Sequence, residues 1–339
     1  MNCDKKISVC IPFYNLEPYV SRCLDSILEN TYRNLEVICV NDGSSDGTSD
    51  LLHNYADNDS RVIVIDKENG GVMSARNAAI AAATGDFISF IDGDDWIHKR
   101  FFEVLMSVWE KSDADTVICA YKKSSEHLSD IEITPSEVLY EFMGQDRMLK
   151  DAHALTHIWG RVYKRSLIPS QNKIPQDITM GEDTALNLLF LYGSNDASTA
   201  AVTAQLYYYF QREGSMVHTV SHAEKIKVSS FLVENFSLFV GRQGKAVVLH
   251  EILRTLLTYR YLEMFCPNQA FVKQRCKNLY VFCKENWVGI LPLRGRIKYC
   301  ILYHVPALYR LFRIVTDPTM LEWERVEKKR QQEQKQVCV

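Results

Sequence analysis

The chain has 339 residues, of which 47% are hydrophobic and 24% are charged, and its formal net charge is -3. This length fits one large domain or two, and the apolar fraction is enough for a sizeable core. The slightly negative charge argues against a protein that binds nucleic acid through overall positive charge. We therefore expect no nucleic-acid partner.

The ten cysteines are scattered along the chain, without a CxxC pair or a His/Cys cluster at metal-ligand spacing. We interpret them as reduced, buried thiols of a cytosolic protein. The N-terminus lacks the apolar segment and cleavage site of a signal peptide, and no apolar stretch reaches the roughly 20 residues that span a bilayer. A cytoplasmic location is therefore expected.

The first part of the chain alternates between strand and helix patterns. Strands are predicted at residues 6–14, 35–42, 61–66, 86–92 and 114–121, and helices at 20–30, 48–56, 73–84 and 98–111. Gly85 is a candidate C-cap for the third helix. This alternation predicts an α/β domain with a mostly parallel, doubly wound sheet, whose ligands gather beyond the carboxyl ends of the strands.

After about Lys123 the strand signals become sparse. We expect a helical segment at 137–143, an irregular stretch at 157–169, a helix at 182–192 and a strand at 201–211. From roughly Ala223 onward the pattern indicates helices, and the chain ends in a polar tail.

The region from Asn286 to Thr316 contains no acidic residue. Its basic residues stand among Leu, Ile, Tyr and Phe, and they are Arg294, Arg296, Lys298, Arg310 and Arg313. Two interpretations stay open. The region forms helices that rest on an anionic membrane surface, as a peripheral membrane protein does, or it packs as an ordinary helical subdomain.

The stretch FISFIDGDDW places aspartates directly after an apolar strand. If the extended geometry continues through Gly93, Asp92 and Asp94 point to the same face. Two converging carboxylates suit Mg²⁺ or Mn²⁺, which could neutralise charge on a diphosphate leaving group. The alternative is a simple turn, because Asp and Gly are favoured there.

Two earlier loops also carry candidate ligand-binding residues. Asp42, in VNDGSSDG, follows the second strand, where its carboxylate could accept a hydrogen bond from a base N–H or belong to a turn. Tyr14, in IPFYN, could stack under a planar base or lie in the core or at its rim.

The motifs PFYN, NDGSSDG, NGGVMSARN and DGDD, in this order, closely resemble those of the family two glycosyltransferases, which have the GT-A fold. The resemblance is rich over about Lys6 to Ala120. It implies a GT-A domain at residues 1–222, divided into a nucleotide-sugar-binding half (1–120) and an acceptor-side half (121–222). A helical region at 223–320 and a tail at 321–339 would follow.

For the donor, the resemblance implies that Pro12 and Tyr14 line the nucleoside pocket. Asp42 would accept a hydrogen bond from the uracil imide. Arg76 would lie near the nucleotide, although it could instead be an exposed residue of an alanine-rich helix.

For the metal, the resemblance places Asp92 nearer the ribose and makes Asp94 the direct ligand. Asp95 could also be a ligand or could cap the next helix. In YYYFQREGSMVH, Arg212 and His218 are candidates to close over the diphosphate, with His218 as a further metal ligand. The alternative for this last stretch is a strand followed by a surface loop.

On the acceptor side, the resemblance assigns Glu182 and Asp183 to the family's acidic motif, with Asp183 as the general base. Acidic residues are also favoured at a helix N-terminus irrespective of catalysis. That position lowers the pKa of a carboxylate, but a weak base can still serve if the acceptor hydroxyl acidifies as it adds. Trp159 would form an acceptor-side wall or belong to the core.

The predicted activity is inverting, metal-dependent transfer of a hexosyl or N-acetylhexosaminyl group from a UDP-sugar to a glycan or lipid-linked acceptor. A nicotinamide-linked dehydrogenase is excluded because IPFYNLEPY lacks GxGxxG, and a nucleotidyltransferase because the chain lacks a glycine-rich, basic phosphate loop. The open alternative is a non-catalytic sugar-nucleotide-binding or scaffold protein. The presence of Asp92, Asp94 and Asp183 together argues against that alternative.

Overall fold

The computed structural model forms two compact units, residues 1–231 with 237–244, and residues 232–236 with 245–339. The strands and the candidate site described below belong to the first unit. The structure describes residues 5–124, 138–143, 152–169, 178, 181–193, 197–211, 228, 231–239, 241–262, 270–287, 290, 296, 299–300 and 303–304.

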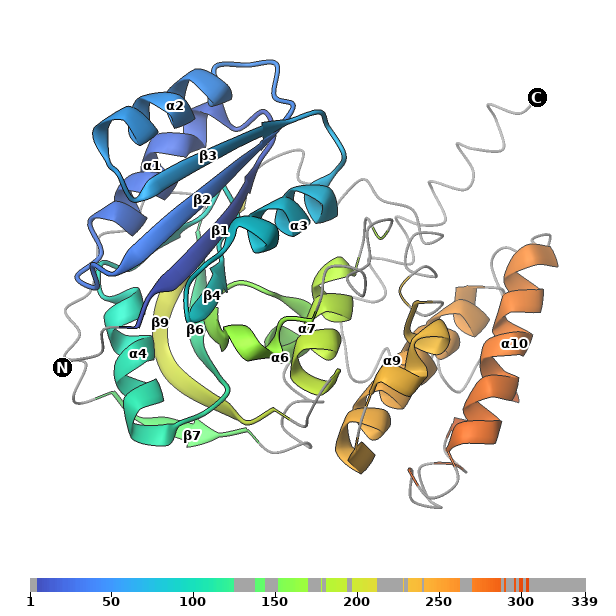
Figure 1. Ribbon diagram of the computed structural model, residues 1–339. Helices are drawn as coiled ribbons and strands as arrows, with labels where there is room; N and C mark the ends of the chain where they lie inside the picture. The colour runs from blue at the N-terminus through green and yellow to red at the C-terminus, as the bar shows by residue number, and fades with distance from the viewer. Residues whose placement is uncertain are drawn as a thin grey trace, which may run out of the picture. The chain divides into compact units, whose positions relative to one another are not determined.

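The first four strands form a parallel sheet in the spatial order β3-β2-β1-β4 (Figure 1). Val9 of β1 lies between Val37 of β2 and Ser89 of β4. The strands and helices predicted in this part of the chain are confirmed. In chain order they are β1 (Ile7–Phe13), α1 (Glu17–Leu28), β2 (Leu35–Asp42), α2 (Thr48–Asn58), β3 (Val62–Lys67), α3 (Val72–Ala82) and β4 (Phe87–Phe90).

Both faces of β1 are buried. Val9 and Ile11 belong to a hydrophobic cluster that includes residues of α1 and of α4 (Phe101–Ser112). Because side chains alternate along a strand, Cys10 points to the opposite face. There α3 packs against β1 and β2, and its buried Met73 lies outside that cluster. The predicted doubly wound α/β class is therefore confirmed.

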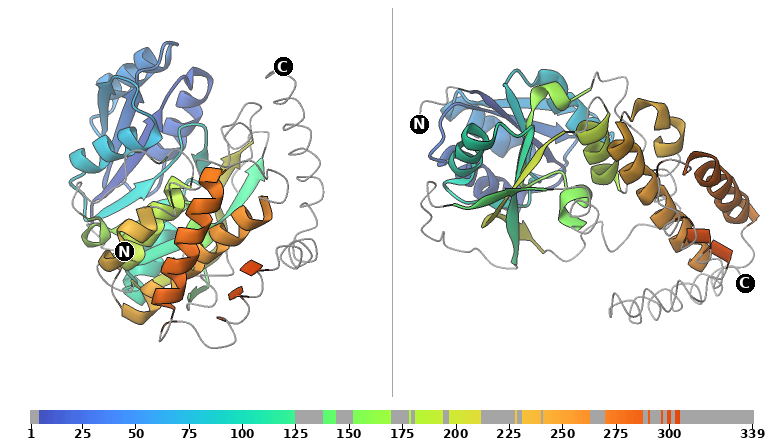
Figure 2. Two further views of the ribbon diagram at one scale, coloured as in Figure 1. Left: turned by 90° about the vertical axis from the view of Figure 1, so that its right-hand side faces the viewer. Right: turned by 90° about the horizontal axis from the view of Figure 1, so that it is seen from below.

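The sheet continues from β4 in the order β8-β6-β9-β5, and β7 pairs with β9. These strands are β5 (Trp96–Ile97), β6 (Thr116–Ser124), β7 (Tyr140–Phe142), β8 (Arg161–Lys164) and β9 (Thr199–Phe210). β8 runs antiparallel to both of its neighbours, whereas β6 and β9 are parallel. α4 packs against β6 and β9, as the right-hand view of Figure 2 shows. The sheet is thus parallel in its first part and mixed in the second.

Three local predictions are wrong. The stretch expected to be irregular at 157–169 contains strand β8, which pairs with β4 and β6. The segment predicted as helical at 137–143 contains strand β7, because pairing with Ala200–Val202 of β9 outweighs its intrinsic preference. Gly85 does not cap α3, which ends at Ala82 with Ala83 as its C-cap. A Cβ atom at Gly85 would lie 2.7 Å from the Lys6 carbonyl oxygen, so Gly85 permits close approach to the start of β1.

The remaining helical elements complete the described chain. They are α6 (Ala152–Thr156), the 3₁₀ turn η2 (Arg165–Leu167), α7 (Glu182–Tyr192), η5 (Phe236–Leu238), α9 (Gly241–Leu262) and α10 (Ala270–Asn286). The predicted helical character of the C-terminal region is confirmed where the structure describes it. Within the described ranges, no helix is both long and apolar enough to cross a membrane.

Candidate active site

The DGDD motif forms a turn directly after β4. The N–H of Asp95 donates to the Asp92 carbonyl oxygen at 3.0 Å. Of the two alternatives for this stretch, the backbone therefore follows the turn, and the chain does not continue as a strand through Gly93. A Cβ atom at Gly93 would lie 2.6 Å from Cδ1 of Phe13. Glycine is therefore required here for the turn to lie against the end of β1.

An arginine from α1 holds this turn from one side. The Nη2 atom of Arg22 donates to the Asp94 carbonyl oxygen at 2.6 Å. Its guanidinium carbon lies 4.3 Å from the ring centroids of both Trp96 and Phe210, a distance at which a cation is attracted to an aromatic face. The sequence analysis missed Arg22, since a single arginine on an amphipathic helix carries no motif.

A tyrosine from β9 holds the turn from the other side. The Tyr207 hydroxyl donates to Oδ2 of Asp95 at 2.6 Å and accepts from the Asp92 N–H at 3.2 Å. Asp95 is fully buried and also accepts from the Phe210 N–H at 2.7 Å. Asp95 therefore does not cap α4, whose N-cap is Arg100. It fastens the turn to β9 instead.

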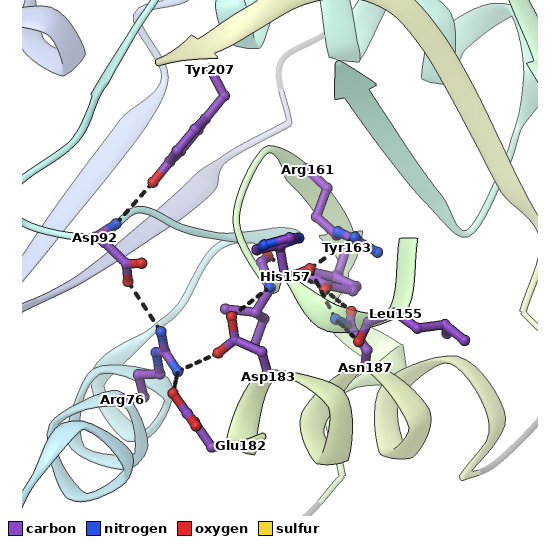
Figure 3. Close-up of polar contacts among 11 residues, drawn as sticks. Arg76, Asp92, Leu155, His157, Arg161, Tyr163, Glu182, Asp183, Asn187 and Tyr207 are labelled. Carbon is purple, nitrogen blue, oxygen red and sulfur yellow. Dashed lines mark hydrogen bonds and ion pairs between the residues drawn. The ribbon is translucent and has the colours of Figure 1, made fainter. Parts of the chain in front are cut away.

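Arg76 joins the turn to the acidic pair at the start of α7 (Figure 3). Its side chain is only 3% exposed, so the alternative of an exposed helix residue is wrong. Nη2 donates to Oδ1 of Asp92 at 3.1 Å, and Nη1 donates to Oδ1 of Asp183 at 2.7 Å. Oε1 of Glu182 lies 3.6 Å from Nη1. One guanidinium thus bridges residues that are distant in the sequence.

The cluster carries more negative than positive charge when all its groups are ionised. Burial raises the pKa of Asp92 to about 6; Arg76 opposes this rise, whereas Asp183 and Asp94 add to it. Burial and the neighbouring Asp183 carboxylate raise the pKa of Glu182 to about 7 against the effect of Arg76. A further cation near these carboxylates would relieve their repulsion.

The available oxygens fit a hard divalent cation. Asp92 and Asp94 belong to one turn, and both are partly exposed. Carboxylate oxygens are the ligands that Mg²⁺ and Mn²⁺ prefer, often only one or two from the protein. Among the described residues, no group of three or more His, Cys, Asp or Glu side chains is placed to hold a metal ion.

Both carboxylate oxygens of Asp183 are hydrogen-bonded. Oδ1 accepts from Arg76, and Oδ2 accepts from the Ile158 N–H at 3.1 Å. The helix that carries Asp183 begins after Gly181, whose φ of 78° is the left-handed conformation that glycine adopts without strain. The carboxylate is thereby fixed in orientation as well as in position.

The predicted nucleoside-binding residues lie at the carboxyl ends of β1 and β2. Tyr14 is 51% exposed, so its ring is accessible, and Pro12 is partly buried. Asp42 is buried and accepts from Lys67 Nζ at 2.6 Å and from the Gly71 N–H at 2.8 Å. Asp42 therefore also holds the start of α3, a role that the sequence did not indicate.

Trp159 lies in the hydrophobic core. It is 2% exposed, and its ring stacks on Tyr207 with a centroid distance of 4.3 Å and an interplanar angle of 9°. Of the two alternatives for Trp159, its burial favours the core over an acceptor-side wall. Arg212 and His218 lie outside the described residues.

Comparisons with known proteins agree with the motifs. The sequence model described as Glycosyl transferase family 2 matches residues 8–168. The chain is 36% identical over 189 residues to the uncharacterized glycosyltransferase EpsJ of Bacillus subtilis, covering 54% of this chain and 55% of EpsJ. It is 29% identical over 338 residues to a poly(ribitol-phosphate) beta-glucosyltransferase of Bacillus spizizenii, covering 87% of this chain and 50% of the relative. The chain thus spans about half the length of these relatives.

The fold also matches a solved structure. Residues 1–349 of S. aureus TarS, crystallised with UDP, superpose with a TM-score of 0.65 over 90% of this chain and 91% of that TarS fragment. The sequence identity is 19%, so this likeness concerns the fold alone. The predicted GT-A architecture is confirmed.

Proposed function

Because residues 8–168 belong to glycosyl transferase family 2, we propose that the chain transfers a sugar from a UDP-sugar to a glycan or lipid-linked acceptor. One observation carries the proposal: the buried Arg76 guanidinium joins the Asp92 turn to Asp183. The carboxylate proposed for the donor side, Asp92, and the proposed base, Asp183, thereby lie close together on one guanidinium group.

The donor nucleotide would bind across the ends of β1 and β2. Tyr14 has an accessible ring for stacking on uracil, with Pro12 beside it and the Asp42 carboxylate within the same edge of the sheet. Arg76 would lie near the nucleotide through its hydrogen bond to Asp92. The complex of TarS with UDP supports a uridine nucleotide.

Mn²⁺ or Mg²⁺ would be held by Asp94, with Asp92 beside it. When bound, the ion supplies positive charge that stabilises the diphosphate leaving group. The two clamps on the turn, from Arg22 and Tyr207, would keep these carboxylates in place before the ion arrives. Arg212 and His218 stay candidates for the same diphosphate.

Asp183 would accept the proton of the attacking hydroxyl. The hydrogen bonds from Arg76 and the Ile158 N–H fix the orientation of this carboxylate, and any carboxylate is only a weak base. A weak base suffices because the hydroxyl becomes acidic as its bond to the anomeric carbon forms. The reaction is then a single displacement with inversion, and Glu182 shapes the acceptor side.

The experiment uses the purified full chain with Mn²⁺ and a panel of UDP-hexoses and UDP-N-acetylhexosamines. UDP release is measured without an acceptor, since water can replace the acceptor hydroxyl. Release from one donor that is lost in Asp94→Ala supports the proposal and identifies the sugar. No release from any donor, with no metal-dependent binding of UDP by calorimetry, would favour the non-catalytic alternative.

We propose a surface-glycan precursor as the acceptor, at the cytoplasmic face of the membrane. The names of the relatives support this, since one acts on poly(ribitol phosphate). The basic and aromatic region from Asn286 to Thr316 would bring the enzyme to that face as a peripheral protein.

Flotation of the full chain with vesicles tests the membrane part separately. Vesicles that contain about a third anionic lipid should carry the chain upward at low salt but not at about 0.5 M salt, because salt screens the attraction. Absence of flotation at low salt would leave the helical-subdomain interpretation.

A further inference from the structure

We infer that Asn187, together with Tyr163 and Arg161, positions the Asp183 carboxylate by fixing the peptide that joins His157 to Ile158. This inference rests on the proposed role of Asp183 as the base and adds three positioning residues to it. None of the three was a candidate site residue in the sequence analysis.

The His157–Ile158 peptide has a defined orientation. Its N–H donates to Oδ2 of Asp183 at 3.1 Å. A planar trans peptide directs its N–H and its C=O to opposite sides. Whatever holds the His157 carbonyl oxygen therefore also aims the Ile158 N–H at the carboxylate.

Asn187 holds that carbonyl oxygen from the helix that carries Asp183. The two residues are four positions apart on α7, so their side chains lie on the same helix face. Nδ2 of Asn187 donates to the His157 carbonyl oxygen at 2.9 Å and to the Leu155 carbonyl oxygen at 3.0 Å (Figure 3). The helix, the peptide and the carboxylate thus form a closed loop of hydrogen bonds.

Two residues of β8 complete the support. The Tyr163 hydroxyl donates to Oδ1 of Asn187 at 2.5 Å, which fixes which way the amide faces. Arg161 donates from Nη2 to the His157 carbonyl oxygen at 2.9 Å and from Nη1 to the Ala154 carbonyl oxygen at 3.0 Å. Asn187, Tyr163 and Arg161 are all fully buried, where a lost partner leaves an unsatisfied polar group. The peptide therefore has little freedom to rotate.

A positioning role predicts a loss of turnover when the residue is replaced, whereas a purely structural role predicts only a loss of stability. Displacing the Ile158 N–H would let the Asp183 carboxylate rotate away from the attacking hydroxyl, and misplacement by about 1 Å can cost about 100-fold in rate. The nucleotide and the metal are assigned to other elements, so their binding should be unaffected. A purely structural defect would instead lower stability without a specific loss of turnover.

The test compares Asn187→Leu with the wild-type chain, using UDP release from the preferred UDP-sugar with Mn²⁺. We expect kcat to fall about 10- to 100-fold. The donor KM and the calorimetric Kd of UDP should stay within about twofold of wild type. In an Asp183→Asn background, Asn187→Leu should cause no further loss, because residues that act through one group are not additive.

Asn30→Leu is the matched control, since Asn30 is also fully buried and donates to a backbone carbonyl oxygen, that of His98, at 3.0 Å. It should lower the unfolding temperature but leave kcat unchanged. If Asn187→Leu does not fold, Tyr163→Phe replaces it in the comparison of the wild-type and Asp183→Asn backgrounds, because this variant removes one hydroxyl and keeps the ring. We expect Tyr163→Phe to cause a smaller loss of kcat, and no loss in the Asp183→Asn background.

The possible results distinguish a failure of the positioning role from a failure of the proposed transferase activity. An unchanged kcat in the folded variant, or an equal loss with and without Asp183, overturns the positioning role while leaving the transferase in place. A loss explained by weaker UDP binding overturns it as well. No release of UDP by the wild-type chain overturns the proposed function and this inference together.

Discussion

The two parts of the first compact unit, the predicted donor-side and acceptor-side halves, hold their candidate groups in different ways. In residues 5–124, Tyr14, Asp42 and the DGDD turn lie at the ends of parallel strands that are neighbours in the sheet, in the order β2-β1-β4. In the acceptor-side half, Asp183 is held by an arginine from α3 and by a peptide that α7 and β8 support. The first arrangement leaves motifs in the sequence, whereas the second depends on contacts that only folding creates.

The largest expected effect tests the acceptor-side half directly. Asp183→Asn should lower kcat by about 10²- to 10⁴-fold, the usual contribution of a general base. Metal-dependent binding of UDP should persist, because Arg76 and Asp92 are retained. Steady-state release of UDP and calorimetry measure the two quantities. Normal turnover in this variant would show that the base lies elsewhere.

Removing the bridge between the halves should affect stability as well. Arg76→Met leaves the carboxylates of Asp92, Glu182 and Asp183 without their shared counter-charge. Removing one partner of a buried ion pair typically lowers the free energy of unfolding by about 3–5 kcal/mol, and we expect a loss of this size. Urea unfolding measures this change in the free energy of unfolding.

Arg100→Met is the control for the bridge. Arg100 pairs with Glu103 in a more exposed setting, where such pairs contribute about 0–1 kcal/mol. A similarly small cost for Arg76→Met would mean that the halves are electrostatically independent.

The raised pKa of Glu182 predicts a pH dependence of stability. Its pKa is about 7 in the folded chain against 4.5 in the unfolded chain, so the folded state binds the proton more tightly. Stability should therefore fall as the pH rises from about 4.5 to about 7, by at most about 3 kcal/mol from this residue. Glu182→Gln should flatten this decline in metal-free urea unfolding curves, and equal slopes for both proteins would contradict the assignment.

A smaller effect is expected on the donor side. Arg22→Met removes the hydrogen bond to the Asp94 carbonyl oxygen and the contact with the Trp96 ring. We expect Mn²⁺-dependent binding of UDP to weaken about 10-fold by calorimetry, as for other residues that orient metal ligands. Arg22→Lys should recover only part of this affinity, because an ammonium group lacks the planar fork. Unchanged affinity in Arg22→Met would limit Arg22 to packing.

The sequence was sufficient for the donor-side half because hydrophobic periodicity and turn residues are local signals. β1, β2, β3 and β4 and their helices lie where the pattern placed them. The same local signals gave a wrong helix at β7, whose strand conformation depends on its partner β9. They also missed β5, which is two residues long.

For the site, the sequence identified the charged groups but not what holds them. Arg76 stands on an alanine-rich helix, where neither exposure nor burial of its side chain is evident from the pattern. Tyr207 and Asn187 resemble ordinary residues of a strand and a helix, and only folding shows that their polar atoms meet Asp95 and the His157 carbonyl oxygen. Hydrogen bonds of this kind join residues that have no fixed separation in the sequence, so no sequence motif reveals them.

The arginine bridge has a practical consequence for building hybrid enzymes. Arg76 and Asp183 are 107 residues apart, yet they share a hydrogen bond of 2.7 Å. A chimera that takes its donor-binding half from this chain and its acceptor half from a relative keeps Arg76 but not Asp183. Parents should therefore be paired by whether they place an acid opposite Arg76, and a crossover after β6 is compatible with activity only when that acid is present.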